Sequence, residues 1–170
     1  TVVMGNARLW DVLKRREELY HEEMTDDVGI ELGELECVVA EEDGYSAEAN
    51  AEILLSGLGV PFSHFGRLMH EIPQDMQFRA LLCQALFGSP EALLLDEPTN
   101  HLDMESIGWL ESFLQNYKGT LIVISHDRHF LNSVVTNILD VDFKKIREFT
   151  GNYDEWYLAA NLIAKQQEME

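Results

Sequence analysis

The stretch Leu93-Leu94-Leu95-Asp96-Glu97-Pro98-Thr99-Asn100-His101-Leu102-Asp103 joins an apolar run to two adjacent carboxylates and a proline. The three leucines predict a fully buried strand, and Pro98 ends it because proline fixes φ and lacks an N–H donor. Asp96 and Glu97 are therefore expected at a strand's carboxyl end, where open α/β sheets bind their ligands. Successive side chains of a strand point to opposite sides, so one carboxylate can serve a metal and the other a reacting water. An acidic pair also suits a solvated strand end that leads into a helix, which is the alternative interpretation.

The residues after this stretch alternate between helix and strand patterns. A helix is predicted for 104–115, followed by a β-branched strand over 121–124 that ends beside His126. This alternation predicts an α/β fold with parallel neighbouring strands and helical crossovers. His126 is then expected to face the same crevice as Asp96 and Glu97, because the carboxyl ends of parallel strands share one edge of the sheet.

His126 also suits a structural role. A histidine at this place can cap a helix or fill a core. Together with His129 it has the i, i+3 spacing of a metal-binding pair, but no third ligand is evident in the sequence.

Helical patterns fill the chain before the first strand. Apolar residues recur at helical spacing over 7–20, 28–42 and 47–58, and a further helix is predicted over 73–87 with Arg79 opposite its apolar face. After His126 we expect a short helix, a β-hairpin and a final helix. The hairpin strands are predicted at 138–141 and 145–149, with the turn at 142–144. We divide the chain into an acidic helical subdomain (1–70), an α/β core (71–150) and a terminal helix (151–170).

The composition excludes some classes of function. The 170 residues include 12 Lys and Arg against 31 Asp and Glu, for a net charge of −19, which argues against a nucleic-acid clamp in this stretch. No apolar run reaches the length of a membrane span, no leader sequence opens the chain, and no Cys-x-x-Cys motif occurs. We expect a soluble, cytoplasmic protein without a membrane partner.

Two strings carry a resemblance to a known family. LLLDEPTNHLD (93–103) and LIVISHDRHFL (121–131) resemble the Walker B, D-loop and H-loop motifs of ATP-binding cassette (ABC) proteins. The DEPTNHLD spelling, DGYSAEA (43–49) and GNYDEWYLAA (151–160) are similar to the F type of this family, soluble tandem-cassette ATPases that act on ribosomes. The resemblance implies a partial P-loop NTPase (ABC ATPase) half-domain that uses ATP and Mg²⁺.

The same resemblance implies a role for each matching residue. Asp96 would hold Mg²⁺ through water, and Glu97 would act as general base or orient the attacking water. His126 would contact the γ-phosphate, and Asp103 would belong to the D-loop that communicates across the cassette dimer. Asp103 taken alone also suits a helix N-cap.

The sequence departs from the family pattern in two places. It contains no G-x-x-x-x-G-K-[ST] phosphate cradle, so we expect a fragment that begins after this motif and binds ATP poorly. Pro73, Gln74, Asp75 and Met76 stand where the family has its LSGGE-like signature. Pro73 removes an N–H, and Asp75 adds negative charge where the signature meets phosphate. The composite site that uses this segment is expected to be weak or inactive, whereas the site with Asp96 can still work.

Three hypotheses for the function follow. The leading one is part of an ATP-hydrolysing F-type cassette, with ATP use coupled to ribosome binding and translation regulation. The alternatives are a degenerate cassette acting as a binding or regulatory module, and the ATPase subunit of a transporter. The helix from Trp156 resembles the start of the linker between two cassettes, which weighs against a transporter subunit. A second cassette followed by a C-terminal tail would look similar, so both positions in the tandem remain open. The expected partners are a second cassette of the same chain, and the ribosome or its RNA through regions outside this segment.

Overall fold

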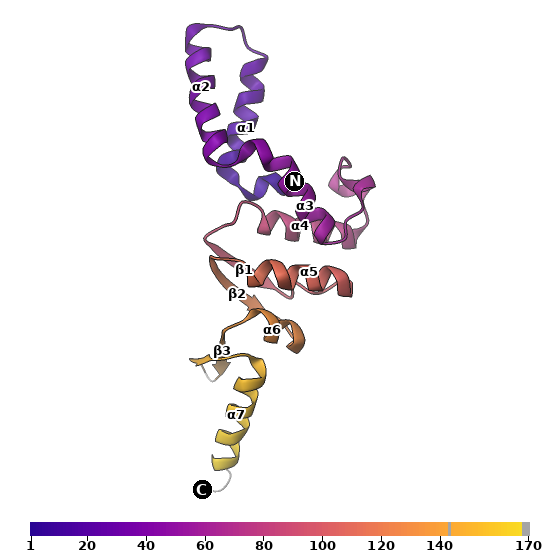
Figure 1. Ribbon diagram of the computed structural model, residues 1–170, viewed down its shortest axis with the longest axis vertical. Helices are drawn as coiled ribbons and strands as arrows, with labels where there is room; N and C mark the ends of the chain where they lie inside the picture. The colour runs from indigo at the N-terminus through magenta and orange to yellow at the C-terminus, as the bar shows by residue number, and fades with distance from the viewer. Residues whose placement is uncertain (143, 168–170) are drawn as a thin grey trace.

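The computed structural model describes residues 1–142 and 144–167. The molecule is elongated, with a helical hairpin at one end, helices and two strands in the middle, and a single helix at the other end (Figure 1). Strands begin only after the first half of the chain, as expected.

The α-helices are α1 (Ala7–Tyr20), α2 (Asp26–Glu41), α3 (Ala47–Gly57), α4 (Gln74–Leu86), α5 (Met104–Gln115), α6 (Arg128–Val134) and α7 (Tyr153–Gln167). The strands are β1 (Ala92–Asp96), β2 (Thr120–Ile124), β3 (Asn137–Asp142) and β4 (Lys145–Thr150). Short 3₁₀ helices span Val2–Gly5, Gly44–Ser46, Phe62–His64 and Met69–Glu71.

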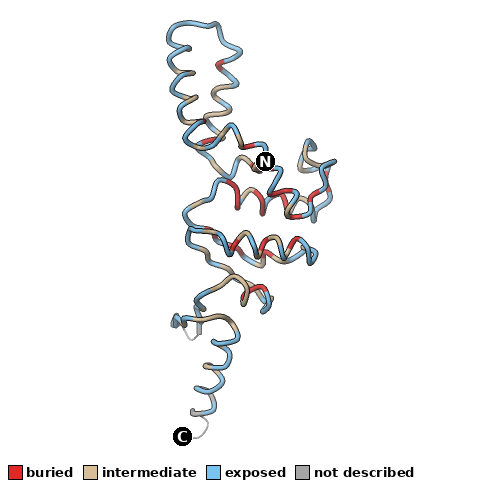
Figure 2. The backbone as a smooth tube through the Cα atoms, viewed as in Figure 1, coloured by how far each residue is buried: buried red, intermediate tan, exposed pale blue. Residues whose placement is uncertain are grey.

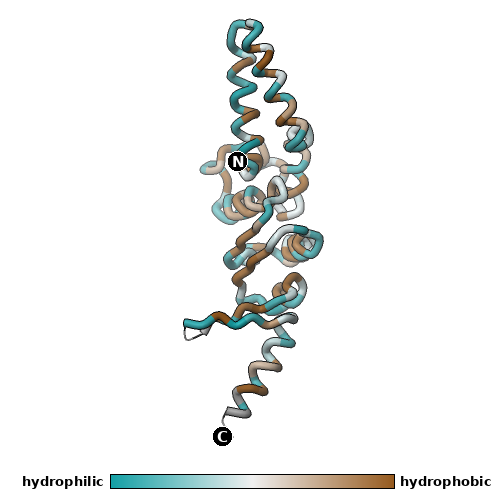
Figure 3. Tube along the Cα trace, turned by 90° about the vertical axis from the view of Figure 1, so that its left-hand side faces the viewer, coloured by the Kyte–Doolittle hydropathy of each residue, from teal (hydrophilic) through white to brown (hydrophobic). Residues whose placement is uncertain are grey.

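Capping side chains define the first residues of α1 and α2. The Asn6 side chain accepts a hydrogen bond from the backbone N–H of Leu9 and starts α1 at the expected residue. The Thr25 side chain accepts a hydrogen bond from the backbone N–H of Val28 and starts α2 at Asp26, two residues before the predicted position. The free end of the hairpin is hydrophilic (Figure 3).

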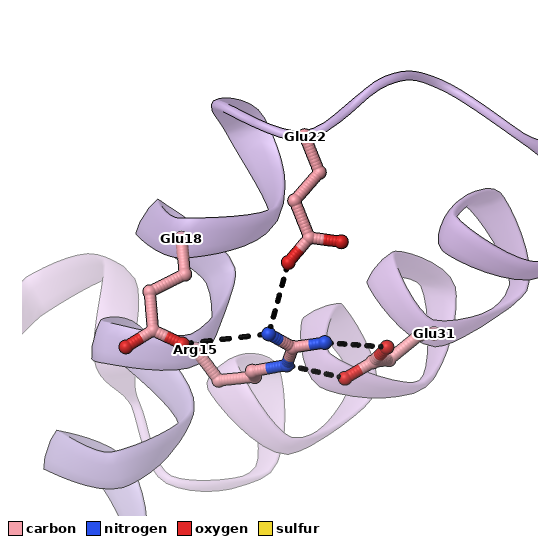
Figure 4. A network of polar contacts seen from close by, with 4 residues as sticks. All are labelled: Arg15, Glu18, Glu22 and Glu31. Carbon is pink, nitrogen blue, oxygen red and sulfur yellow. Dashed lines mark hydrogen bonds and ion pairs between the residues drawn. The ribbon is translucent and has the colours of Figure 1, made fainter.

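Arg15 joins the two helices of the hairpin. Its guanidinium forms a two-pronged ion pair with Glu31 on α2, at 2.7 and 3.1 Å (Figure 4). It also contacts Glu22 at 3.1 Å and Glu18 at 3.4 Å. Hydrogen bonding to Arg15 lowers the pKa of the Glu31 carboxyl below its ordinary value. Some of the acidic side chains on this surface are therefore paired with arginine and are not isolated charges.

The hydrophobic core lies in the middle of the long axis. Buried residues gather on α3, α4, α5 and α6 (Figure 2). Leu58, Leu86, Leu110 and Phe130 are each at most 2% exposed and come from successive parts of the chain. Burying a side chain of this size stabilises the fold by about 1.5–3 kcal/mol. The core thus connects the helical first half to the strands.

The predicted parallel sheet is confirmed. β1 and β2 pair in parallel, with Leu94 opposite Ile122 and Asp96 opposite Ile124. The chain between them forms α5, as the predicted crossover requires (Figure 1).

The expectation that the leucine strand is fully buried is wrong. Leu93 and Leu95 are buried, but Leu94 is 70% exposed, and Ile122 and Ile124 on β2 are 47% and 60% exposed. In the part of the chain that the structure describes, helices cover only the face that carries Leu93 and Leu95. The other face of this two-stranded sheet is open and apolar.

The last third contains the predicted hairpin and terminal helix. β3 and β4 pair antiparallel, with Asn137 opposite Thr150. Part of the predicted turn, Phe143, lies outside the described residues. The aromatic start of α7 packs on α6 as expected, because the Arg128 guanidinium lies 5.4 Å from the Tyr153 ring centre and 5.7 Å from that of Tyr157. Among the described helices, none is both long and apolar enough to cross a membrane.

Candidate functional site

The carboxyl end of β1 presents two acidic side chains in different settings. Asp96 is the last residue of the strand and lies exposed on the same face as Leu94. Glu97 continues the pairing through its backbone N–H, which donates to Ile124 O at 2.7 Å. Its φ of 48° is in the left-handed region, which non-glycine residues rarely adopt. Pro98 follows and is fully buried, so the chain turns sharply at this pair.

Glu97 contacts the end of the neighbouring strand. Its Oε2 accepts a hydrogen bond from the backbone N–H of His126 at 3.3 Å, and Oε1 lies 3.5 Å from His126 Nε2. The Glu97 side chain is 25% exposed, whereas that of His126 is 99% exposed. The two strand ends meet at one edge of the sheet, as the sequence led us to expect. Glu97 is oriented by the protein, while the imidazole is free to meet a ligand.

The segment around His126 is held by local hydrogen bonds. Ser125 Oγ accepts from the N–H of Asp127 at 3.0 Å. Asp127 Oδ1 in turn accepts from the N–H of Phe130 at 3.1 Å and caps α6. His126 is thus presented between a strand end and a capped helix, and it is neither a cap nor a core residue.

Asp103 has two partners. Its Oδ1 accepts from the Ser106 N–H at 2.8 Å, which makes it the N-cap of α5, and its Oδ2 accepts from Arg79 Nη1 at 3.2 Å. Its side chain is 57% exposed. Ser106, through its N–H and then its hydroxyl, lowers the pKa of the Asp103 carboxyl, and Arg79 lowers it further. The N-cap interpretation is confirmed for this residue.

The segment Pro73–Met76 lies at the start of α4. Pro73 is the N-cap residue, one position earlier than the first helical turn we expected, and Gln74 opens the helix. Gln74 and Asp75 are exposed, and Met76 is half-buried. Within residues 1–142 and 144–167, no hydrogen bond joins this segment to Asp96, Glu97 or His126.

Our sequence analysis also placed Arg79 wrongly. We expected it opposite the apolar face of its helix, but it is 6% exposed and bonded to the loop that carries Asp103. Arg79 and the buried Leu82 and Leu86 recur at i, i+3 and i+7, so the helical period already contained the signal.

The exposed strand end fits a magnesium ion. Mg²⁺ prefers oxygen ligands and is held in proteins by one or two carboxylates together with water. Asp96 is exposed, and its carboxylate has no hydrogen-bond or ion-pair partner in the described part of the chain. The residues present do not fit a triphosphate, because the sequence has no glycine-rich loop followed by lysine and the strand end is acidic.

Titration of this 170-residue chain with Mg-ATP is therefore expected to show no saturable binding below the millimolar range. Isothermal calorimetry can measure this, with a cassette that contains the G-x-x-x-x-G-K-[ST] motif as the positive control. Micromolar affinity would contradict the expectation that a chain without this motif binds ATP poorly.

This edge of the parallel sheet combines a carboxylate that fits a metal ion with a second carboxylate oriented by the protein, the groups that metal-assisted hydrolysis uses. No family model matches the chain. The chain is 48% identical over 165 residues to the uncharacterized ABC transporter ATP-binding protein YkpA of Bacillus subtilis, covering 96% of this chain and 31% of that protein. It is 37% identical over 157 residues to ATP-binding cassette sub-family F member 2 of Bos taurus, covering 92% and 24%.

A third relative has a name that refers to translation. It is the energy-dependent translational throttle protein EttA of Haemophilus influenzae, 37% identical over 131 residues, which cover 77% of this chain and 23% of that protein. This chain belongs to the ATP-binding cassette family, and its relatives include members of the F type. It spans less than a third of the length of each of these three relatives.

Proposed function

We propose that this chain is the part of an F-type cassette that supplies the catalytic carboxylates for ATP hydrolysis, coupled to ribosome binding and the regulation of translation. One observation carries the proposal: Glu97 and His126 contact each other across the ends of two parallel strands, with the Asp96 carboxylate exposed beside them. Residues 1–70 would form a helical subdomain, 71–150 the catalytic core and 151–170 the start of the linker to a second cassette.

Each residue of the site has a distinct proposed task. Asp96 would hold Mg²⁺ through water, and the metal would supply positive charge against the phosphates. Glu97 orients the attacking water or takes its proton, because the His126 N–H already fixes the direction of its carboxylate. The exposed His126 ring would contact the γ-phosphate of a nucleotide held by the rest of the cassette. Asp103, on the loop between β1 and α5, would face the second cassette.

The segment Pro73–Met76 is assigned to a different composite site. It has no hydrogen bond to the Glu97 strand end among the described residues, and it carries an exposed carboxylate at Asp75. A negative charge there opposes phosphate binding. We infer that the site closed by this segment is weak, and that the site of Glu97 is closed by the signature of the second cassette.

The ribosome is the proposed macromolecular partner and the cytoplasm the proposed location. A net charge of −19 disfavours direct binding of this segment to the ribosomal RNA backbone. Contacts with RNA are therefore assigned to other parts of the full-length protein. The competing proposal, a degenerate cassette that serves only as a binding module, is supported by Pro73 and Asp75.

Ribosome co-sedimentation of the full-length protein distinguishes these proposals. We expect more protein in the ribosome pellet with Mg-ATP than with Mg-ADP, because in the proposed function ATP would close the two cassettes and hydrolysis would reopen them. Equal amounts with both nucleotides would favour the binding module. Absence of the protein from the pellet under both conditions would contradict the coupling to ribosomes.

A further inference from the structure

The guanidinium of Arg79 is buried and donates several hydrogen bonds. The side chain is 7% exposed, and burying a cation is costly unless several acceptors surround it. Nη1 donates to Leu58 O at 2.8 Å and to Asp103 Oδ2 and Ser106 Oγ at 3.2 Å each, while Nη2 donates to His101 O at 2.9 Å. Nε is buried without a partner in the described part of the chain.

These acceptors come from separate elements. Leu58 follows the last residue of α3, His101 lies in the loop between β1 and α5, and Asp103 and Ser106 begin α5. Arg79 itself is in the second turn of α4. A planar guanidinium with five donors can satisfy acceptors in several directions at once, which an ammonium at the same place cannot do. Arg79 therefore joins α4 to α3, the loop and α5 through one group.

The loop that receives Arg79 has an unfavourable backbone conformation. Glu97 and His101 have φ values of 48° and 65°, and non-glycine residues with such values are stable only when the surroundings impose them. Glu97 is held by β2, because its backbone N–H donates a hydrogen bond to Ile124 O. His101 is held by α4. Its carbonyl accepts the hydrogen bond from Arg79, and the Phe78 ring lies edge-on to its imidazole with ring centres 5.8 Å apart.

The backbone beside Arg79 is shaped for this contact. Gly59 has φ of +72°, and a Cβ atom there would lie 2.6 Å from Arg79 Nη1 and 2.8 Å from Ser106 Oγ. Any other residue would collide with the guanidinium or push it away. The close approach of this glycine leaves space for the buried cation, which is a second observation independent of the hydrogen bonds.

We propose that Arg79 is a positioning residue that fixes the loop from Thr99 to Asp103 on α4 and, through this loop, holds the strand end that carries Glu97. Because α4 starts directly after Pro73, a displacement of this segment moves Arg79 and the loop together. The segment Pro73–Met76 thus has a mechanical connection to Asp103 even though its sequence disfavours phosphate. The effect on catalysis rests on the function proposed above, whereas the effect on the loop does not.

Arg79→Met and Arg79→Lys in the full-length protein test the proposal with two readouts. Methionine fills a similar volume without donors, and lysine keeps the charge but loses the planar fork. Hydrogen–deuterium exchange is expected to become about tenfold faster at residues 99–107 in Arg79→Met, with β1 and β2 unchanged. The kcat for ATP is expected to fall on the order of 10- to 100-fold with KM nearly constant, because misplaced groups slow the chemical step. Arg79→Lys should lie between wild type and Arg79→Met in both readouts.

Arg15→Met is the matched control. Arg15 also has several ion-pair partners, but it lies in the α1–α2 hairpin away from the strand ends (Figures 1 and 4). The Arg15→Met substitution should change neither the hydrogen–deuterium exchange of residues 99–107 nor kcat.

The outcomes that contradict the proposal differ for its two parts. Unchanged exchange at residues 99–107 in Arg79→Met, or faster exchange spread evenly over the chain, would overturn the positioning role. A faster-exchanging loop with unchanged kcat would overturn the connection to Glu97. If wild type itself hydrolyses no ATP, the proposed function fails while the exchange result still decides the positioning role.

Discussion

Glu97→Gln in the full-length protein is expected to lower ATP turnover on the order of 10²- to 10⁴-fold, the usual contribution of a general base. Glutamine keeps the shape of the side chain and can still accept the hydrogen bond from the His126 N–H. Glutamine cannot take a proton from water, and it lacks the negative charge that orients the attacking water molecule. Steady-state phosphate release at saturating Mg-ATP measures the effect, and KM should stay nearly constant.

Glu91→Gln is the matched control for this substitution. Glu91 is exposed and lies just before β1, at the opposite end of the strand from Glu97. The same loss of one carboxylate there should leave turnover unchanged. Wild-type turnover in Glu97→Gln would reject the catalytic role of Glu97 and favour the view of this cassette as a binding module.

Phe130→Ala is expected to lower the free energy of unfolding by about 3–5 kcal/mol, the range for deleting a buried phenylalanine. Phe130 is 0% exposed and belongs to the main core cluster. It also lies in the first turn of α6, where its N–H bonds to Asp127 directly after His126. Loss of the ring therefore removes core packing and loosens the segment that presents His126. Urea unfolding followed by tryptophan fluorescence measures the change.

Phe62→Ala is the matched control, because it removes an aromatic ring that is not packed in the core. Phe62 is 77% exposed, so its removal is expected to change stability by less than about 0.5 kcal/mol. Similar losses in Phe62→Ala and Phe130→Ala would contradict the core position of Phe130.

The parts of the fold that local patterns control were predictable from the sequence. The helix over Ala7–Tyr20 and the helix over Met104–Gln115 match their predicted bounds, because apolar periodicity and capping side chains act within a few residues. The alternation of strand and helix predicted the parallel pairing of β1 with β2. That pairing was sufficient to bring His126 beside Glu97, since parallel strands end at the same edge.

Burial and polar partners depended on contacts between distant parts of the chain. Leu94 has the same local pattern as Leu93 and Leu95, yet it is 70% exposed because helices cover only one face of the described two-stranded sheet. Arg79 is charged and was expected at the surface, but acceptors 21 to 27 residues away in sequence surround it. The LLLDEPTNHLD stretch therefore specified a strand ending in two carboxylates and a helix cap at Asp103. Only the tertiary structure decided which face of the strand is covered and which cation holds the loop, because both depend on surfaces that come together after the local elements have formed.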